Sequence, residues 1–264
     1  MTIQAYEQLL RGKVVEAAVR GVRRIPDLNP ALFGYQRSVT EFALETGCSG
    51  AFLDTGLGKS LISLEWGRVV AEETGRPVLM LAPLAVAHQH VREARKFGLE
   101  ARVVASADDV RPGVNVTNYA KIDHFDASVF GGVILDESSI IKSFTGATTR
   151  KLMKLFEATP FRLACTATPS PNDHMELGQH CQFLGVMASN EMLTRWFIAD
   201  QTNMGRYRLK GHAVKPFWNW VASWSRCLSK PSDLGFSDDG FDLPPLNLRR
   251  HEVKADISVD MIVQ

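Results

Sequence analysis

The residues best suited to chemistry lie in one short stretch, which reads Thr55-Gly56-Leu57-Gly58-Lys59-Ser60. Glycines let the backbone turn tightly and direct its N–H groups inward, which forms a cradle for phosphate groups. Lys59 can then reach the β and γ phosphates of a nucleoside triphosphate, and the Ser60 hydroxyl can ligate Mg²⁺. Residues 61–66 are typical of a helix whose N-terminus would strengthen anion binding. The full phosphate-loop pattern has one more glycine, replaced here by Leu53. The alternative is a glycine-rich turn with an incidental lysine.

Two acidic residues, Asp136 and Glu137, follow the apolar run 131–135, which suits a buried strand. A strand that carries carboxylates at its end, downstream of a phosphate loop, is the arrangement expected of a Mg²⁺-dependent phosphoryl-transfer site. We expect Asp136 to hold the metal through water, and Glu137 to orient and deprotonate the attacking water. The alternative is a solvated strand end, which Asp and Glu often mark.

Hydroxyl and amide side chains lie at two further points of interest. The apolar run 161–165 ends in Thr166 and Thr168, whose hydroxyls could bond the Asp136–Glu137 loop. Gln36 precedes the phosphate loop, and its amide can donate to and accept from an adenine edge at once. We therefore predict that Gln36 recognises adenine.

Six short apolar runs, separated by helical stretches, must position these residues. They are residues 50–53, 77–81, 102–105, 114–117, 133–135 and 161–165. Apolar strands that alternate with helices predict a parallel sheet covered on both faces, with ligands at the carboxyl ends of its strands. Apolar residues at helical spacing predict one helix over 3–25, and a second is expected from about 38 to 45.

The composition excludes several classes of protein. The chain has 264 residues and 45% hydrophobic residues, enough for a buried core, and its formal charge of +1 gives no overall field for nucleic acid. Its 4 cysteines form no CxxC pair, which argues against a zinc site and a disulfide framework. No apolar run approaches the roughly 18 residues of a membrane span, and the N-terminus lacks signal-peptide features, so we expect a cytoplasmic protein.

His88 and His90 would point apart on a helix, and we interpret both as surface residues rather than metal ligands.

The order of the motifs resembles that of superfamily 2 helicases and translocases. Lys59 with Ser60, Asp136 with Glu137, and Thr166 with Thr168 are similar to motifs I, II and III of that family. Residues 54–60 are closest to the Swi/Snf-type branch, and 136–142 and 168–177 look most like its phage-encoded DEAD/DEAH-box members. The resemblance covers about residues 30–250. It implies an α/β P-loop NTPase of RecA-like fold, with ATP and Mg²⁺ as cofactors and DNA-dependent ATP hydrolysis that drives movement on DNA.

The same resemblance implies contacts to the DNA backbone from strand-end loops. The residues concerned are Pro83, Leu84, Thr117, Asn118 and Lys142. They offer backbone N–H groups, hydroxyls and charge to phosphates, which carry no sequence information. A helix with Arg150, Lys151 and Lys154 is either a solvated face or a further DNA contact. Aromatic and basic residues alternate over 190–234 and could stack bases, but the helical spacing of Phe217, Trp220 and Trp224 favours packing.

The resemblance also implies a division of the chain. We expect an N-terminal helical extension at 1–30, a RecA-like ATP-binding lobe at 31–189, a helical insertion or brace at 190–240, and a linker at 241–264. This linker would lead to a second RecA-like lobe, in cis or in trans. Because the family's arginine finger comes from that lobe, we expect this chain to bind ATP but to hydrolyse it poorly. Ser139 replaces the usual motif II histidine, which alters the coupling to motif III. The alternatives are a nucleotide-regulated nucleic-acid-binding module without motor activity and an unrelated P-loop kinase.

Overall fold

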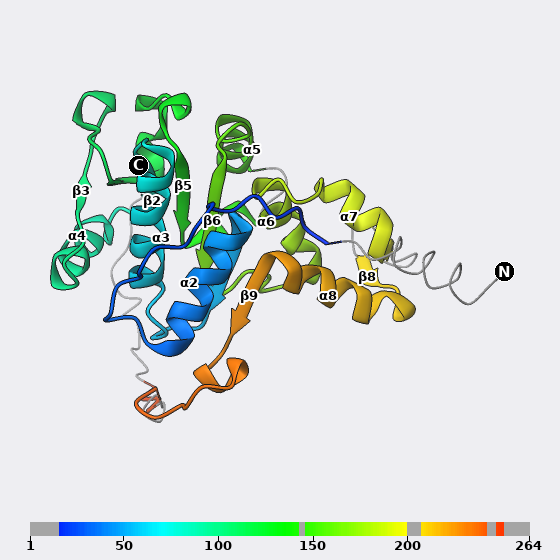
Figure 1. Cartoon of the computed structure of the whole chain (residues 1–264). Helices are drawn as coiled ribbons and strands as arrows, with labels where there is room; N and C mark the ends of the chain where they lie inside the picture. Colours follow the sequence, from blue (N-terminus) through cyan, green and yellow to red (C-terminus); the bar gives the residue numbers. More distant parts are fainter. Residues whose placement is uncertain (1–15, 143–145, 200–206, 242–246, 251–264) are drawn as a thin grey trace, which may run out of the picture.

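Short apolar segments form a seven-stranded sheet at the centre of the computed structural model, which describes residues 16–142, 146–199, 207–241 and 247–250 (Figure 1). Its strands are β1 (Cys48–Leu53), β2 (Val78–Ala82), β3 (Ala101–Val103), β4 (Val114–Asn118), β5 (Gly132–Asp136), β6 (Phe161–Thr166) and β9 (Ser225–Leu228). They lie in the order β3-β4-β2-β5-β6-β1-β9, and every pair is parallel. The α/β fold class and all six predicted strands are confirmed.

Helices bury both faces of the sheet, which explains why its strands read as continuous apolar runs. One core includes residues of α2 (Gly34–Thr46), α3 (Lys59–Thr74) and α4 (Ala87–Lys96). The other includes residues of α5 (Ala147–Leu155), α6 (Leu177–Phe183), α7 (Ser189–Trp196) and α8 (Val214–Trp224). Short 3₁₀ turns connect them: η1 (Ala107–Asp109), η2 (Tyr119–His124), η3 (Ala127–Val129), η4 (Ser138–Ile141), η5 (His174–Glu176), η6 (Gly211–Ala213) and η7 (Pro231–Leu234). No helix among the described residues is long and apolar enough to cross a membrane.

The helix predicted over residues 3–25 is wrong for residues 16–25, which have no helical turn; residues 3–15 lie outside the described residues. The backbone N–H groups of Arg20 and Val22 donate to the carbonyl oxygens of Thr46 and Leu44 at the end of α2. A helix C-terminus has carbonyls without intrahelical partners. This segment binds those carbonyls instead of forming its own ladder.

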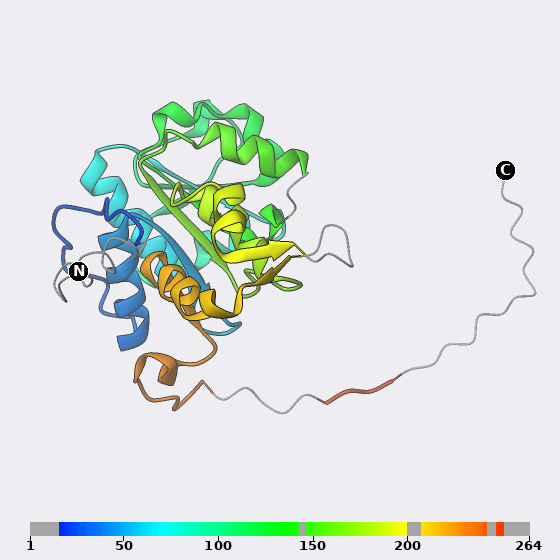
Figure 2. The same cartoon turned by 90° about the vertical axis from the view of Figure 1, so that its right-hand side faces the viewer.

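The aromatic region near the C-terminus is part of the core. Trp196, Phe217, Trp220 and Trp224 are buried and contact one another in a chain of rings. The packing interpretation is confirmed for these rings, whereas Trp218 is 38% exposed. An antiparallel pair, β7 (Phe197–Ala199) and β8 (Tyr207–Leu209), lies beside α8 (Figure 2). The segment after α8 forms β9, which is the outermost strand of the main sheet and pairs with β1.

Candidate nucleotide site

Three neighbouring strands bring the three motifs together at the carboxyl ends of the strands, which form one edge of the sheet. β6 lies between β1 and β5, and the pairing places Phe52 beside Thr166 and Cys165 beside Asp136. All three strands are parallel, so their carboxyl ends meet at the same edge. The glycine-rich loop follows β1, Asp136 ends β5, and Thr166 ends β6.

The loop between β1 and α3 has the backbone shape that its glycines allow. Gly56 and Gly58 adopt φ values of 86 and 74, in the left-handed region that other residues rarely adopt. The α3 helix begins at Lys59, so the first helical N–H groups lie at the loop. The Lys59 ammonium donates to the carbonyl oxygens of Leu53 at 2.9 Å and Asp54 at 3.2 Å. A positive charge and free N–H groups are therefore concentrated at the end of β1.

Tyr35 and Gln36 hold this loop from the first turn of α2. Both the Tyr35 hydroxyl and the Gln36 amide nitrogen donate to the carbonyl oxygen of Leu57, at 3.0 and 3.2 Å. The Gln36 amide oxygen accepts from the Phe33 N–H at 3.0 Å. A Cβ on Gly58 would lie 2.2 Å from the Gln36 nitrogen, so only glycine fits there without a shift. Because Gln36 is occupied by the protein itself, adenine recognition requires these bonds to open, and it stays a prediction.

A histidine that we expected at the surface contacts the metal-ligand candidate. His90 is 3% exposed, and its Nε2 lies 2.8 Å from Oδ2 of Asp136, which is also buried. The surface interpretation of His90 is wrong because Ala87, His90, Val91 and Ala94 form the buried face of α4. Their i, i+3, i+4, i+7 spacing in the sequence was the signal that could have placed His90 against the sheet.

Two buried groups near Asp136, the Cys165 thiol and the Tyr119 hydroxyl, have raised pKa values. Burial raises the pKa of the Cys165 thiol on β6; the Asp136 charge raises it further, and the Lys59 charge opposes this. Burial, followed by the Asp136 charge, also holds the pKa of Tyr119 well above its usual value. The Tyr119 hydroxyl donates to the Asp136 carbonyl oxygen at 2.7 Å. The Lys59 and Asp136 charges therefore both act on the buried Cys165 thiol, in opposite directions.

Glu137 has a strained backbone and lines a cavity. With φ 52 and ψ 51, it is the only non-glycine residue with positive φ in the described part of the chain. Such a conformation costs about 1–3 kcal/mol and persists where the surroundings impose it. Glu137 lines a cavity of about 500 Å³ together with Pro83, Leu84, Asn118 and Lys142.

The structure thus brings four of the five predicted DNA-contact residues to one place. Leu84 is 75% exposed at this cavity. Thr117, the fifth residue, does not line it; the Thr117 side chain is buried, and its hydroxyl has no partner among the described residues.

Thr166 and Thr168, whose hydroxyls were predicted to bond the Asp136–Glu137 loop and so to couple motifs II and III, bond within their own loop. Thr166 Oγ1 accepts from the Thr168 N–H at 3.1 Å, and neither side chain bonds the Asp136–Glu137 loop in the described structure. A different link joins that loop to α6: Ser138 Oγ and His180 Nε2 are hydrogen-bonded at 3.1 Å, and both are buried. We did not predict this link, because the two residues are far apart in the sequence.

The side chains at this edge fit a magnesium-bound triphosphate. Ser60 is the second residue of α3, beside the loop. At the end of β5, the Oδ1 atom of Asp136 has no hydrogen-bond partner among the described residues. No group of three or more His, Cys, Asp or Glu residues that could hold a metal occurs in the described ranges. Mg²⁺ is usually bound through one or two protein oxygens with phosphates and waters, so a cage of protein ligands is not required.

Comparisons with known proteins identify the fold. No protein-family model and no curated protein matches the sequence. The SWI2/SNF2 ATPase core of Sulfolobus solfataricus in complex with dsDNA aligns with TM-score 0.66 and 19% identity, over 82% of this chain and 48% of that one. The same core domain in another structure aligns with TM-score 0.57 and 20% identity, over 81% of this chain and 45% of that one. The UvsW helicase of bacteriophage T4 aligns with TM-score 0.48 and 18% identity, over 71% of this chain and 66% of that one. The chain therefore shares the RecA-like α/β fold of the SWI2/SNF2 ATPase core, and it spans about half the length of that core.

Proposed function

We propose that this chain is the ATP-binding lobe of a DNA-dependent ATPase of the helicase or translocase type. The observation that carries the proposal is the order β5-β6-β1, which places Lys59, Ser60 and Asp136 at one sheet edge. The RecA-like fold supports it, and the sequence motifs favour a Swi/Snf-type, phage-like member. On this proposal, the cofactors are ATP and Mg²⁺ and the partner is DNA.

Each side chain at the edge has a role in this function. Lys59 and the N–H groups of the loop from Thr55 to Gly58 bind and neutralise the phosphates, for which the Thr55 and Leu57 N–H groups leave the Asp54 oxygens. Ser60 and Asp136 would hold the magnesium ion, which neutralises charge on the phosphates when bound. Glu137 orients the attacking water and accepts its proton. Lys59 leaves the carbonyl oxygens of Leu53 and Asp54 to do this, and these bonds are replaced by stronger ones to a charged oxygen.

An exposed ring next to the loop gives the nucleobase a surface. Phe33 is 58% exposed and stacks on Tyr35, with ring centroids 6.3 Å apart. Phe241 contacts both rings edge-on. We place the adenine on Phe33, beside Gln36, because an exposed aromatic face can stack on any base.

The cavity of Glu137 is the place where this lobe would meet DNA. Backbone N–H groups after Pro83, the Asn118 amide and the Lys142 ammonium suit sugar and phosphate groups, which any sequence presents. Since Glu137 lines the same cavity, a strand bound there would lie against the residue that activates water. This contact gives a direct physical route for DNA to stimulate hydrolysis.

A thermal-shift titration with Mg·ATP tests the nucleotide site. ATP at about 100 times its dissociation constant should stabilise the chain by about 2.7 kcal/mol, which raises Tm by about 5–10 °C. Lys59→Ala should abolish this shift and leave the fold intact, because its ammonium bonds only backbone carbonyls. Lys215→Ala, at an exposed position on α8, is the matched control and should behave as the parent. Equal protection of Lys59→Ala would contradict the assignment.

Phosphate release tests the reaction itself. We expect the chain alone to hydrolyse ATP slowly with or without DNA, because an arginine finger supplied by a second RecA-like lobe is worth about a thousandfold or more. Brisk DNA-stimulated turnover by the isolated chain would show that it needs no second lobe. Glu137→Gln should remove the residual turnover and retain the ATP-induced thermal shift.

A further inference from the structure

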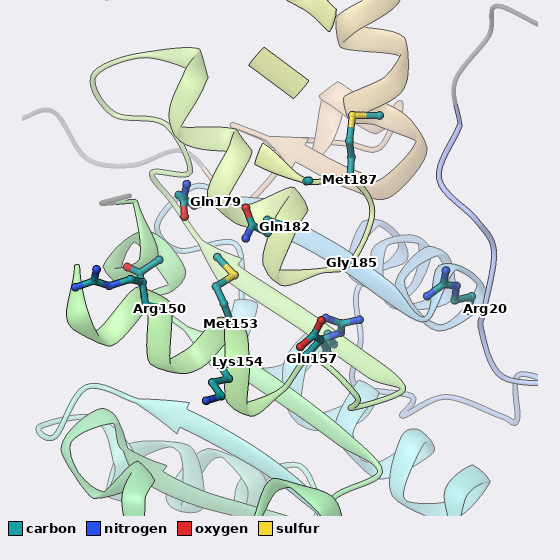
Figure 3. A pocket seen from close by; sticks show the side chains of 12 residues that line it. Arg20, Arg150, Met153, Lys154, Glu157, Gln179, Gln182, Gly185 and Met187 are labelled. Atoms are coloured by element: carbon teal, nitrogen blue, oxygen red, sulfur yellow. The ribbon is translucent and has the colours of Figure 1, made fainter. Parts of the chain in front are cut away.

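A second cavity, of about 750 Å³, lies between α5 and α6 and is lined by unusually many cationic side chains. Figure 3 shows Arg150 and Lys154 of α5 on one side, Arg20 on the other, and Gln182 of α6 between them. Arg162, near the first residue of β6, also lines it. The proposed ATP site lies at the carboxyl ends of the strands, which we call the nucleotide edge. Arg162 is near the opposite end of β6, so this cavity is separate from that site.

The charges of this cavity are unbalanced. Four cations, Arg20, Arg150, Lys154 and Arg162, line the cavity, and among the described residues its only lining carboxylate is that of Glu157. Across the described ranges, none of these four cations takes part in an ion pair. A site with an excess of positive charge attracts an anion that carries more than one negative charge.

Arg162 places one of these charges inside the protein. The residue is 7% exposed, and its Nη1 donates to the Phe183 carbonyl oxygen at 2.6 Å. Its Nε is buried and has no hydrogen-bond partner in the described structure. Gly185, at φ 67, allows the guanidinium to approach, because a Cβ there would lie 2.5 Å from Nη2. A buried guanidinium without a counterion is costly, so the site is built to receive one.

Two further polar groups line the same cavity. The Thr149 hydroxyl is buried without a partner among the described residues. The Gln182 amide oxygen accepts from the Ser189 N–H at 3.2 Å, which leaves the amide nitrogen as a donor. A hydroxyl, an amide N–H and a guanidinium fork are the donors that phosphate oxygens accept.

We propose that this cavity binds a terminal phosphate, as a monoester or diphosphate. The volume is in the range of small-ligand pockets, about 300–1,000 Å³. A terminal phosphate can reach a nearly buried guanidinium, whereas a phosphodiester inside a strand carries a sugar on each side. Two or more negative charges match the cationic excess better than the single charge of a carboxylate. The phosphate comes from a small phosphorylated molecule or from the 5′ end of a nucleic acid strand.

Calorimetric titration with pyrophosphate tests the site, using the Lys59→Ala chain so that the glycine-rich loop does not bind the probe. We expect saturable binding to one site. Replacement of two exposed cations, Arg150→Gln with Lys154→Gln, should weaken it at least about tenfold, since each lost hydrogen bond to a charged group is worth that much. The matched control is Arg92→Gln with Arg95→Gln, two exposed arginines on α4. This pair removes the same charge and should leave the affinity unchanged.

Absence of saturable binding, or equal weakening by the control pair, would overturn the proposal. Competition with tetrathymidylate, with and without a 5′-phosphate, then separates the sources. Displacement of pyrophosphate only by the phosphorylated oligonucleotide supports a strand end as ligand. If neither oligonucleotide competes, the site takes a small phosphorylated molecule. Equal competition by both oligonucleotides would show binding of internal phosphodiesters and refute the terminal-phosphate assignment.

Discussion

The contribution of the hydrogen bond between His90 and Asp136 to the free energy of unfolding can be measured by replacing each residue alone and then both together. His90→Ala removes the buried side chain that holds Oδ2 of Asp136, at 2.8 Å. Asp136→Ala removes the carboxylate, and the double variant removes the bond without leaving either partner alone. The free energy of unfolding of the four proteins, without nucleotide or metal, gives the coupling energy of the pair.

The structure sets the expected size of this coupling. Both side chains are nearly buried, with 4% and 11% exposure, so solvent screens their interaction little. Hydrogen bonds to charged groups contribute about 1.5–3 kcal/mol, and a buried partner left unpaired adds its desolvation cost. We therefore expect His90→Ala to cost about 2–3 kcal/mol, which lowers Tm by about 4–12 °C. The double variant should be more stable than the sum of the single effects predicts, by about 1.5–3 kcal/mol.

Urea denaturation followed by circular dichroism provides these free energies. His88→Ala is the matched control, because His88 is exposed on the same helix and should change stability by less than about 0.5 kcal/mol. A coupling energy below about 0.5 kcal/mol would refute the reasoning, since the two residues would then contribute independently. If the bond also positions Asp136 for the metal, His90→Ala should require more Mg²⁺ for the same protection by ATP.

Three other perturbations have defined outcomes. Burial lowers the pKa of His180 to about 4, from 6.5, so the unfolded chain binds a proton first as pH falls. The free energy of unfolding should therefore decrease by up to about 3 kcal/mol between pH 6.5 and 4 because of His180. Denaturation at pH 7 and pH 5 should show a smaller loss of stability for His180→Gln than for the parent. Gly58→Ala imposes φ 74 on alanine and a 2.2 Å approach to Gln36, so urea melts should show a loss of about 1–3 kcal/mol; an unchanged midpoint would mean that the loop rearranges freely. Trp220→Ala should cost about 3–5 kcal/mol and Trp218→Ala only about 1, and similar losses would argue against the packing role of the first.

The nucleotide edge was predictable because each part of it is local. Gly58 and Lys59 are adjacent, Asp136 directly ends an apolar run, and parallel strands place such ends together. The roles given to these side chains stay predictions, since they concern ligands. His90 was missed because it was considered only as a possible metal ligand, although the apolar residues around it mark the buried face of α4.

Features that depend on distant partners could not be read from the sequence. The segment 16–25 has helical spacing, but carbonyl groups at the end of α2 compete for its N–H groups. The strand Ser225–Leu228 pairs with β1 across most of the chain, and its own residues give only a weak β signal. Arg162 looked like an ordinary charged residue, and only the packing of α6 shows that it is enclosed.

Residues 136–138 are anchored to opposite sides of the sheet, which gives a reason for the strained Glu137 between them. Asp136 is held by His90 of α4, in the layer of α2 and α3, whereas Ser138 is held by His180 of α6, in the other layer. Two fixed neighbours can impose a left-handed conformation that a free residue would leave. A shift of α6 would therefore act on Glu137 through Ser138, while His90 keeps Asp136 in place.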